Sequence, residues 1–151
     1  MPSLALSIDL ASGLCCLFAL WKGGAPERAA AAAIAANLLI GQAGHVLAPH
    51  LNDEIRLVND GLAALILLGV AVRYARPWMG AVMLFYAAQF SMHAYYLVME
   101  RKGGDYLHAL INNLDFIGIN LCLVIGTIVG WRRRLREAQT VPATQRRFTP
   151  R

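Results

Sequence analysis

The sequence predicts an all-α integral membrane bundle of five transmembrane helices, with four as the alternative. Hydrophobic residues make up 58% of the 151 residues and charged residues only 15%, whereas soluble domains carry about 25% charged residues. A soluble globule of this length would have too few charges to cover its surface. At about 20 residues per crossing plus connections, the length allows five spans but not seven.

Prolines separate the long apolar runs of the chain. Pro26, Pro49 and Pro77 lie between the runs and no proline interrupts one, which is how proline behaves at helix ends. Each run has 18 or more residues, enough for a span of roughly 27 Å at 1.5 Å per residue. The predicted helices are residues 4–21, 27–48, 53–75, 78–99 and 105–131.

Each predicted helix has its own justification. The first contains Asp9, has no basic residue before it and has no small-residue cleavage motif after it, so we expect a retained span rather than a signal peptide. The second lies between Pro26 and Pro49, and the fourth begins directly after Pro77. The third and fifth are apolar runs that open with polar residues.

The basic residues predict the orientation. All but three of the 14 Lys and Arg residues fall on one side of a five-span bundle, the exceptions being Arg56, Arg101 and Lys102. Because cytoplasmic loops are rich in Lys and Arg, we expect the N-terminus outside and the C-terminus in the cytoplasm, in a bacterial inner membrane. An aromatic belt is expected at the cytoplasmic interface, where all three tryptophans fall: Trp21, Trp78 and Trp131.

The chain is expected to divide into a transmembrane bundle at residues 1–131 and a tail at residues 132–151. The tail is polar, basic and poor in apolar residues. We expect a disordered cytoplasmic extension that holds the topology and contacts anionic lipid. Nucleic acid is not an expected partner.

Ionisable residues gather toward the opposite, outer side of the bundle. All four histidines and seven of the nine acidic residues map to outer loops or to the outer halves of the helices. Because such groups are costly inside a bilayer, they are expected to face the bundle interior and to pair with one another. Each helix offers one of them, roughly 6 to 15 Å from its outer end: Asp9, His45, Asp60, His93 and Asp115.

Helical spacing supports this inward orientation. Polar or small residues recur on one face of three predicted helices, and we expect these stripes to face one another. The stripes are Asn37, Gly41 and His45 on the second helix, Tyr86, Gln89, His93, Tyr96 and Glu100 on the fourth, and Asp105, His108, Asn112 and Asp115 on the fifth.

Two of these histidines point to a cofactor site between helices. The second and fourth helices run in the same direction, so His45 and His93 reach the same leaflet at similar depth, as a b-type haem held by two histidines requires. In this limited respect the chain resembles membrane b-type cytochromes. The same pair suits a transition metal completed by Asp60 or Asp115. Three polar residues are expected behind these ligands: Gln89, His108 and Asn112.

The most concrete function predicted from this pattern is electron transfer or metal handling, and four alternatives stay open. The polar groups could serve only to hydrogen-bond between helices and fix their packing. The chain could be a non-catalytic accessory subunit of a larger membrane complex, or a homo-oligomer. It could be a proton-coupled small transporter. A membrane hydrolase with a histidine and carboxylate metal centre would need an open coordination position, so enzymatic activity is left open.

Overall fold

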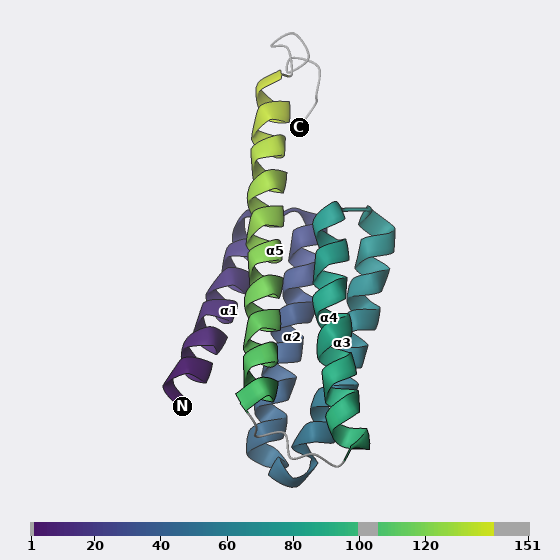
Figure 1. The fold of residues 1–151 in the computed structure, drawn as a ribbon. Helices are drawn as coiled ribbons and strands as arrows, with labels where there is room; N and C mark the ends of the chain where they lie inside the picture. Colours follow the sequence, from purple (N-terminus) through teal and green to yellow (C-terminus); the bar gives the residue numbers. More distant parts are fainter. Residues whose placement is uncertain (1, 100–105, 141–151) are drawn as a thin grey trace.

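A computed structural model describes residues 2–99 and 106–140, with side chains from residue 6 onward. This part of the chain contains five α-helices, one short 3-10 turn and no strand. The all-helical class and the five helices predicted from the sequence are therefore confirmed (Figure 1). The elements are α1 (Pro2–Lys22), α2 (Ala25–Leu47), the 3-10 turn η1 (Pro49–Leu51), α3 (Asn52–Tyr74), α4 (Pro77–Val98) and α5 (Tyr106–Thr140).

Three helical segments in the described residues are long and apolar enough to cross a membrane. They are Ala25–Leu47, Pro49–Tyr74 and Tyr106–Thr140. The side-chain distribution agrees, because large apolar side chains such as Leu65 and Leu84 are mostly exposed, whereas Asp60, Gln89 and His93 are buried. An apolar outer surface around a partly polar interior suits a bilayer. These features indicate a membrane protein.

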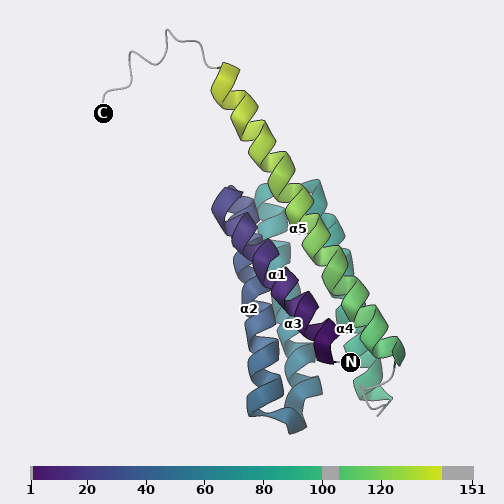
Figure 2. The same ribbon diagram turned by 90° about the vertical axis from the view of Figure 1, so that its left-hand side faces the viewer.

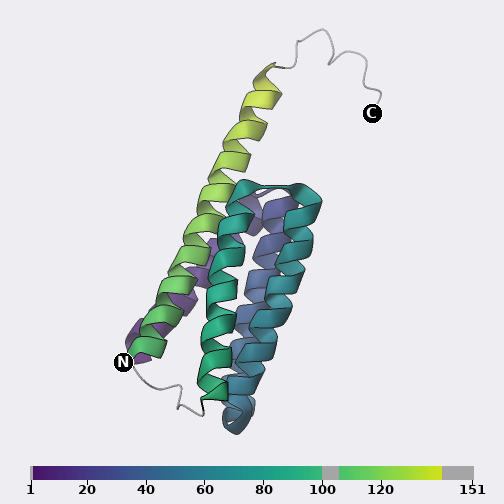
Figure 3. The ribbon, with the colours of Figure 1, turned by 45° about the vertical axis from the view of Figure 1, so that its right-hand side comes forward.

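The five helices form a closed ring. Each helix packs against the next one along the chain, and α1 packs against α5. Helices α2 and α5 also meet across the ring. Figure 2 shows α1 crossing in front of the bundle, and Figure 3 shows α5 beside α4. All five helices can therefore contribute side chains to one interior site.

The interior is divided into two halves along the helix axes. Apolar side chains make up most of the half nearest the end of α1 and the start of α2, where Glu27 and Thr127 are buried polar exceptions; the apolar residues include Ile34, Leu67, Val82, Ile119 and Leu123. Polar side chains occupy the other half, where α2 ends and α3 begins. The candidate site thus lies toward one end of the bundle rather than at its centre.

Close helix packing positions α5 against α4. A Cβ atom at Gly118 would overlap the Phe85 ring, and one at Gly126 would overlap the Trp78 ring. The two glycines let these aromatic rings lie directly on the α5 backbone. Small residues at helix interfaces are typical of membrane bundles for this reason.

Helix α5 continues past Trp131 to Thr140, so the disordered tail predicted from residue 132 is wrong as far as residue 140. The far end of the extension stands clear of the other helices (Figure 1), whereas Arg134 near its start contacts α1 and α2. Arg133 and Glu137 pair at 2.8 Å within it, an i,i+4 contact that supports a helix. Arg134 donates to the Lys22 carbonyl oxygen at 2.6 Å. The last eleven residues of the predicted tail, 141–151, lie outside the described residues.

Candidate functional site

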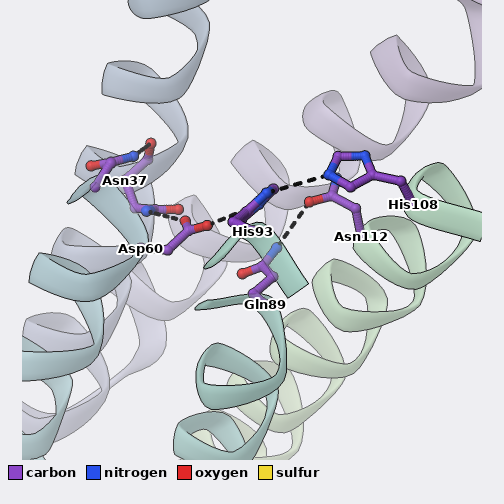
Figure 4. A network of polar contacts seen from close by, with 7 residues as sticks. Asn37, Asp60, Gln89, His93, His108 and Asn112 are labelled. Carbon is purple, nitrogen blue, oxygen red and sulfur yellow. Dashed lines mark hydrogen bonds and ion pairs between the residues drawn. The ribbon is translucent and has the colours of Figure 1, made fainter. Parts of the chain in front are cut away.

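Three side chains from three helices form a buried chain of polar contacts. Asp60 Oδ2 on α3 lies 3.2 Å from His93 Nε2 on α4. His93 Nδ1 lies 3.3 Å from His108 Nε2 on α5. Figure 4 shows His93 between the other two. The three residues are 5%, 5% and 6% exposed, so this is an interior network rather than an interfacial one.

Helix α2 holds the far side of the Asp60 carboxylate. Asn37 Nδ2 donates to Asp60 Oδ1 at 3.0 Å, and Asn59 Nδ2 donates to the Asn37 carbonyl oxygen at 2.7 Å. Both oxygens of Asp60 therefore have a polar partner. Because an unpartnered buried carboxylate is expensive, this arrangement is what allows Asp60 to stay inside the bundle.

A second pair of contacts lies beside this chain. Gln89 Nε2 on α4 donates to Asn112 Oδ1 on α5 at 3.3 Å (Figure 4). Asp115, one turn further along α5, interacts electrostatically with His93 and Asp60. Its Oδ2 atom has no hydrogen-bond partner among the described residues. The site therefore holds two carboxyl groups and two imidazoles within one interior region.

The contacts of His93 and His108 can be satisfied in two protonation states. When His93 is neutral with a hydrogen on Nε2, it donates to Asp60 and accepts at Nδ1 from the Nε2–H of His108. When His93 carries both hydrogens, it donates to Asp60 and to His108, whose Nε2 then accepts. The network can therefore take up a proton without leaving either histidine contact unmatched.

A polar cavity of about 90 Å³ adjoins this network. One buried water needs about 10–15 Å³ by the same measure, so the cavity has room for several waters or a solute of a few heavy atoms. Asp9 Oδ2 accepts from Gln42 Nε2 at 2.7 Å near its edge. All five helices supply polar lining: Asp9; Asn37 and Gln42; Arg56, Asn59 and Asp60; His93; Asn112 and Asn113.

The structure brings Asp60, His93, Gln89, His108, Asn112 and Asp115 together, but not His45. The buried face of α2 carries Ile34, Asn37 and Gly44. His45 lies in the last turn of α2, directly after Gly44 and about 100° around the helix from it. It is exposed, as is His50 in η1. The inward orientation predicted for His45 is therefore wrong, and His108 is the histidine that meets His93.

The donor set does not fit the predicted metal or haem. Both ring nitrogens of His93 already have side-chain partners. Among the residues that the structure describes, no three His, Cys, Asp or Glu side chains gather as a metal site. A metal, haem or metallohydrolase centre built on His45, His93, Asp60 and Asp115 thus stays a prediction without support from these residues, and no step below depends on one.

Two parts of the site were missed by reasoning from sequence. Asn37 was placed in a polar stripe, but its bond to Asp60 depends on the rotation of α2 against α3, which spacing within one helix does not reveal. Arg56 was assigned only to an outer segment, although it lines the cavity. It lies one turn before Asp60, and this i,i+4 spacing was the available signal.

Comparison of this chain with family models, with curated proteins and with solved structures found no match.

Proposed function

We propose that the protein is a proton-linked membrane carrier for a small polar solute. The observation that carries the proposal is the buried Asp60–His93–His108 chain directly beside a polar cavity lined by all five helices. Ionisable side chains inside a membrane are costly and mark ion, proton or substrate pathways. A network that served packing alone would need no adjoining polar cavity.

In this proposal all five helices cross the membrane, with the N-terminus outside and the C-terminus in the cytoplasm of a bacterial cell. The support is the charge asymmetry of the sequence and the ring, in which α1 and α4 pack against their neighbours as the three candidate spans do. The cavity then opens toward the outer side. The exposed arginines of the α5 extension lie on the cytoplasmic side, where we propose that they contact anionic lipid.

The chain's own residues supply each part of the proposed cycle. In this cycle a proton taken up by His93 lies between the Asp60 carboxylate and the His108 ring, with which the His93 ring nitrogens are in contact. The change in His93 charge alters the field in the cavity, because His93 is part of its lining. A solute that binds better in one charge state of His93 is thereby coupled to the proton.

Proton uptake into liposomes that contain the full chain and an internal pH-sensitive dye tests the proposal. Pyruvate, glycine or glycerol is added outside as an anionic, zwitterionic or neutral probe, with protein-free liposomes as background. We expect internal acidification with at least one probe. We expect Asp60→Asn and His93→Gln to abolish it, and His45→Gln, which changes an exposed histidine, to retain it.

The same assay separates the competing accounts. Failure of all three probes, or unchanged acidification by His93→Gln, would contradict the carrier and favour a structural network or an accessory subunit. Loss of activity in His45→Gln as well as His93→Gln would instead match the two-histidine cofactor site predicted from the sequence. Size-exclusion elution of each variant shows whether the bundle has folded before its activity is compared.

A further inference from the structure

We propose that the polar cavity binds a small carboxylate anion, with Arg56 as its direct partner. The ligand class deepens the proposed carrier function and its proton link rests on that function. Arg56 lines the cavity, and its Nε atom is shielded from solvent with no hydrogen-bond partner among the described residues. An unused buried donor on a charged group is costly. A ligand oxygen bound to the guanidinium would remove that cost.

The acidic side chains of the cavity are already occupied by other donors. Asp9 accepts from Gln42, and it interacts with Arg56 through its charge. Asp60 accepts from Asn37 and faces His93 with its other oxygen. The group left without a partner, Arg56 Nε, is therefore a hydrogen-bond donor, and a ligand that binds there must supply an acceptor atom.

The affinity of the cavity for an anion should depend on whether His93 is protonated. Asp9, Arg56 and Asp60 line the cavity and Asp115 interacts with His93, so protonation of His93 makes the charge of the site less negative by one unit. The titratable groups near His93 are Asp60 from α3, and His108 and Asp115 from α5; the α2 residues that line the cavity, Asn37 and Gln42 among them, carry no charge. An anion should therefore bind more tightly at lower pH and enter together with one proton.

The size and shape of the site favour a small monocarboxylate. A volume of about 90 Å³ suits an anion of a few heavy atoms. The planar guanidinium fork matches a carboxylate through two parallel hydrogen bonds, a geometry that lysine cannot supply. The neighbouring amides Asn112 and Asn113 offer further uncharged contacts. The cavity thus provides one charged hydrogen-bond donor group, the guanidinium, and several uncharged polar contacts.

Saturation-transfer NMR on the acetate methyl signal tests this proposal with the full chain in detergent micelles. Acetate stays ionised at pH 6 and pH 8, so a change in affinity reports the protein. We expect tighter binding at pH 6. Arg56→Gln should weaken acetate binding roughly 10- to 100-fold, and Arg56→Lys should fall between it and the native chain. Arg28→Gln changes an exposed cation at the other end of the bundle and should have no effect.

Acetamide, which has nearly the shape of acetate without its charge, should not compete. Equal binding of acetate to the native chain and Arg56→Gln would overturn the proposal, as would no detectable acetate binding at either pH. Proton uptake driven by glycine or glycerol in liposomes, without acetate binding, would keep the carrier and refute the ligand class. Acetate binding that is identical at both pH values and in His93→Gln would keep Arg56 as an anion site and refute its proton link.

Discussion

Two buried carboxyl groups differ in what surrounds them. Asp60 has polar partners on both oxygens, whereas Asp115 leaves one oxygen without a hydrogen bond among the described residues. We expect Asp60→Ala to lower the free energy of unfolding by about 1–3 kcal/mol and Asp115→Ala to lower it by less. Unfolding of the two variants in mixed micelles by increasing dodecyl sulfate measures the difference. A larger loss in Asp115→Ala would contradict the assigned contacts.

The Asp60 and His93 side chains should act as a unit. A double-mutant cycle with Asp60→Asn and His93→Gln is expected to give a coupling energy of about 0.5–3 kcal/mol, because removing either partner strands the other. The exposed pair Arg133 and Glu137 provides the control, and its coupling energy should be too small to measure. Strict additivity at Asp60 and His93 would show that they do not interact.

Residue positions along a helix could be predicted where one face is clearly polar. Gln89, His93 and Tyr96 recur at i, i+4 and i+7 on α4, and all three are buried. The same reasoning failed at His45, which is exposed although it lies only about 20° around the helix from the buried Ile34. In the last turn of α2 the neighbouring helices decide which edge of the face is buried, and spacing within one helix does not reveal this.

A buried acidic residue ties the α5 extension to the start of α2. Glu27 is 1% exposed; its Oε2 accepts from the Gly24 backbone N–H at 2.7 Å and lies 3.5 Å from Arg134 Nη1. Arg134→Ala removes the charged partner of Glu27 and the bond to the Lys22 carbonyl oxygen. We expect a loss of about 1–2 kcal/mol, discounted because the Arg134 side chain is 41% exposed.

The matched control for this variant is Arg133→Ala, which removes a neighbouring arginine whose pair is exposed on both sides. It should leave the unfolding transition almost unchanged. If both variants unfold alike, the α5 extension does not stabilise the bundle through Glu27.

Glycine substitutions probe how closely α4 and α5 approach. Gly118→Ala forces the Phe85 ring to move, so we expect a loss of about 1–3 kcal/mol from overpacking. Gly80→Ala adds a methyl group where nothing lies within 4 Å. It should be neutral or stabilising by up to about 1 kcal/mol through helix propensity. Thermal unfolding of the two variants in the same micelles makes the comparison, and a Gly118→Ala variant as stable as Gly80→Ala would refute the close approach.

The positions of the helices could be predicted from the sequence because prolines and apolar runs are local signals. The α3 to α4 connection is an example: Ala75 takes a left-handed conformation with φ of 48° at the end of α3, and Pro77 begins α4. The end of α5 could not be predicted in this way, because the Arg134 contacts with Lys22 and Glu27 are made across more than a hundred residues of chain. Local composition predicted a tail, and long-range contacts extend the helix.

The topology of the whole molecule gives a prediction of its own. If the basic residues mark the cytoplasmic side as the sequence predicts, a cysteine at His50 should react with a membrane-impermeant maleimide on intact cells, and one at Arg28 only after permeabilisation. Both positions are exposed. The native cysteines, Cys15, Cys16 and Cys122, are first replaced by alanine to remove their background. The reverse labelling pattern would show that the bundle has the opposite orientation, with the cavity on the cytoplasmic side.

The measurement that tests the central claim most directly is ¹⁵N NMR of histidine-labelled full-length protein in lipid bilayers between pH 8 and pH 5. The account predicts that one imidazole signal lost in His93→Gln gains a proton over this range. It also predicts that a second signal, assigned through His108→Gln, changes tautomer with it, because His93 and His108 share a contact. Protonation confined to the exposed rings of His45 and His50, with the His93 signal constant throughout, would contradict it.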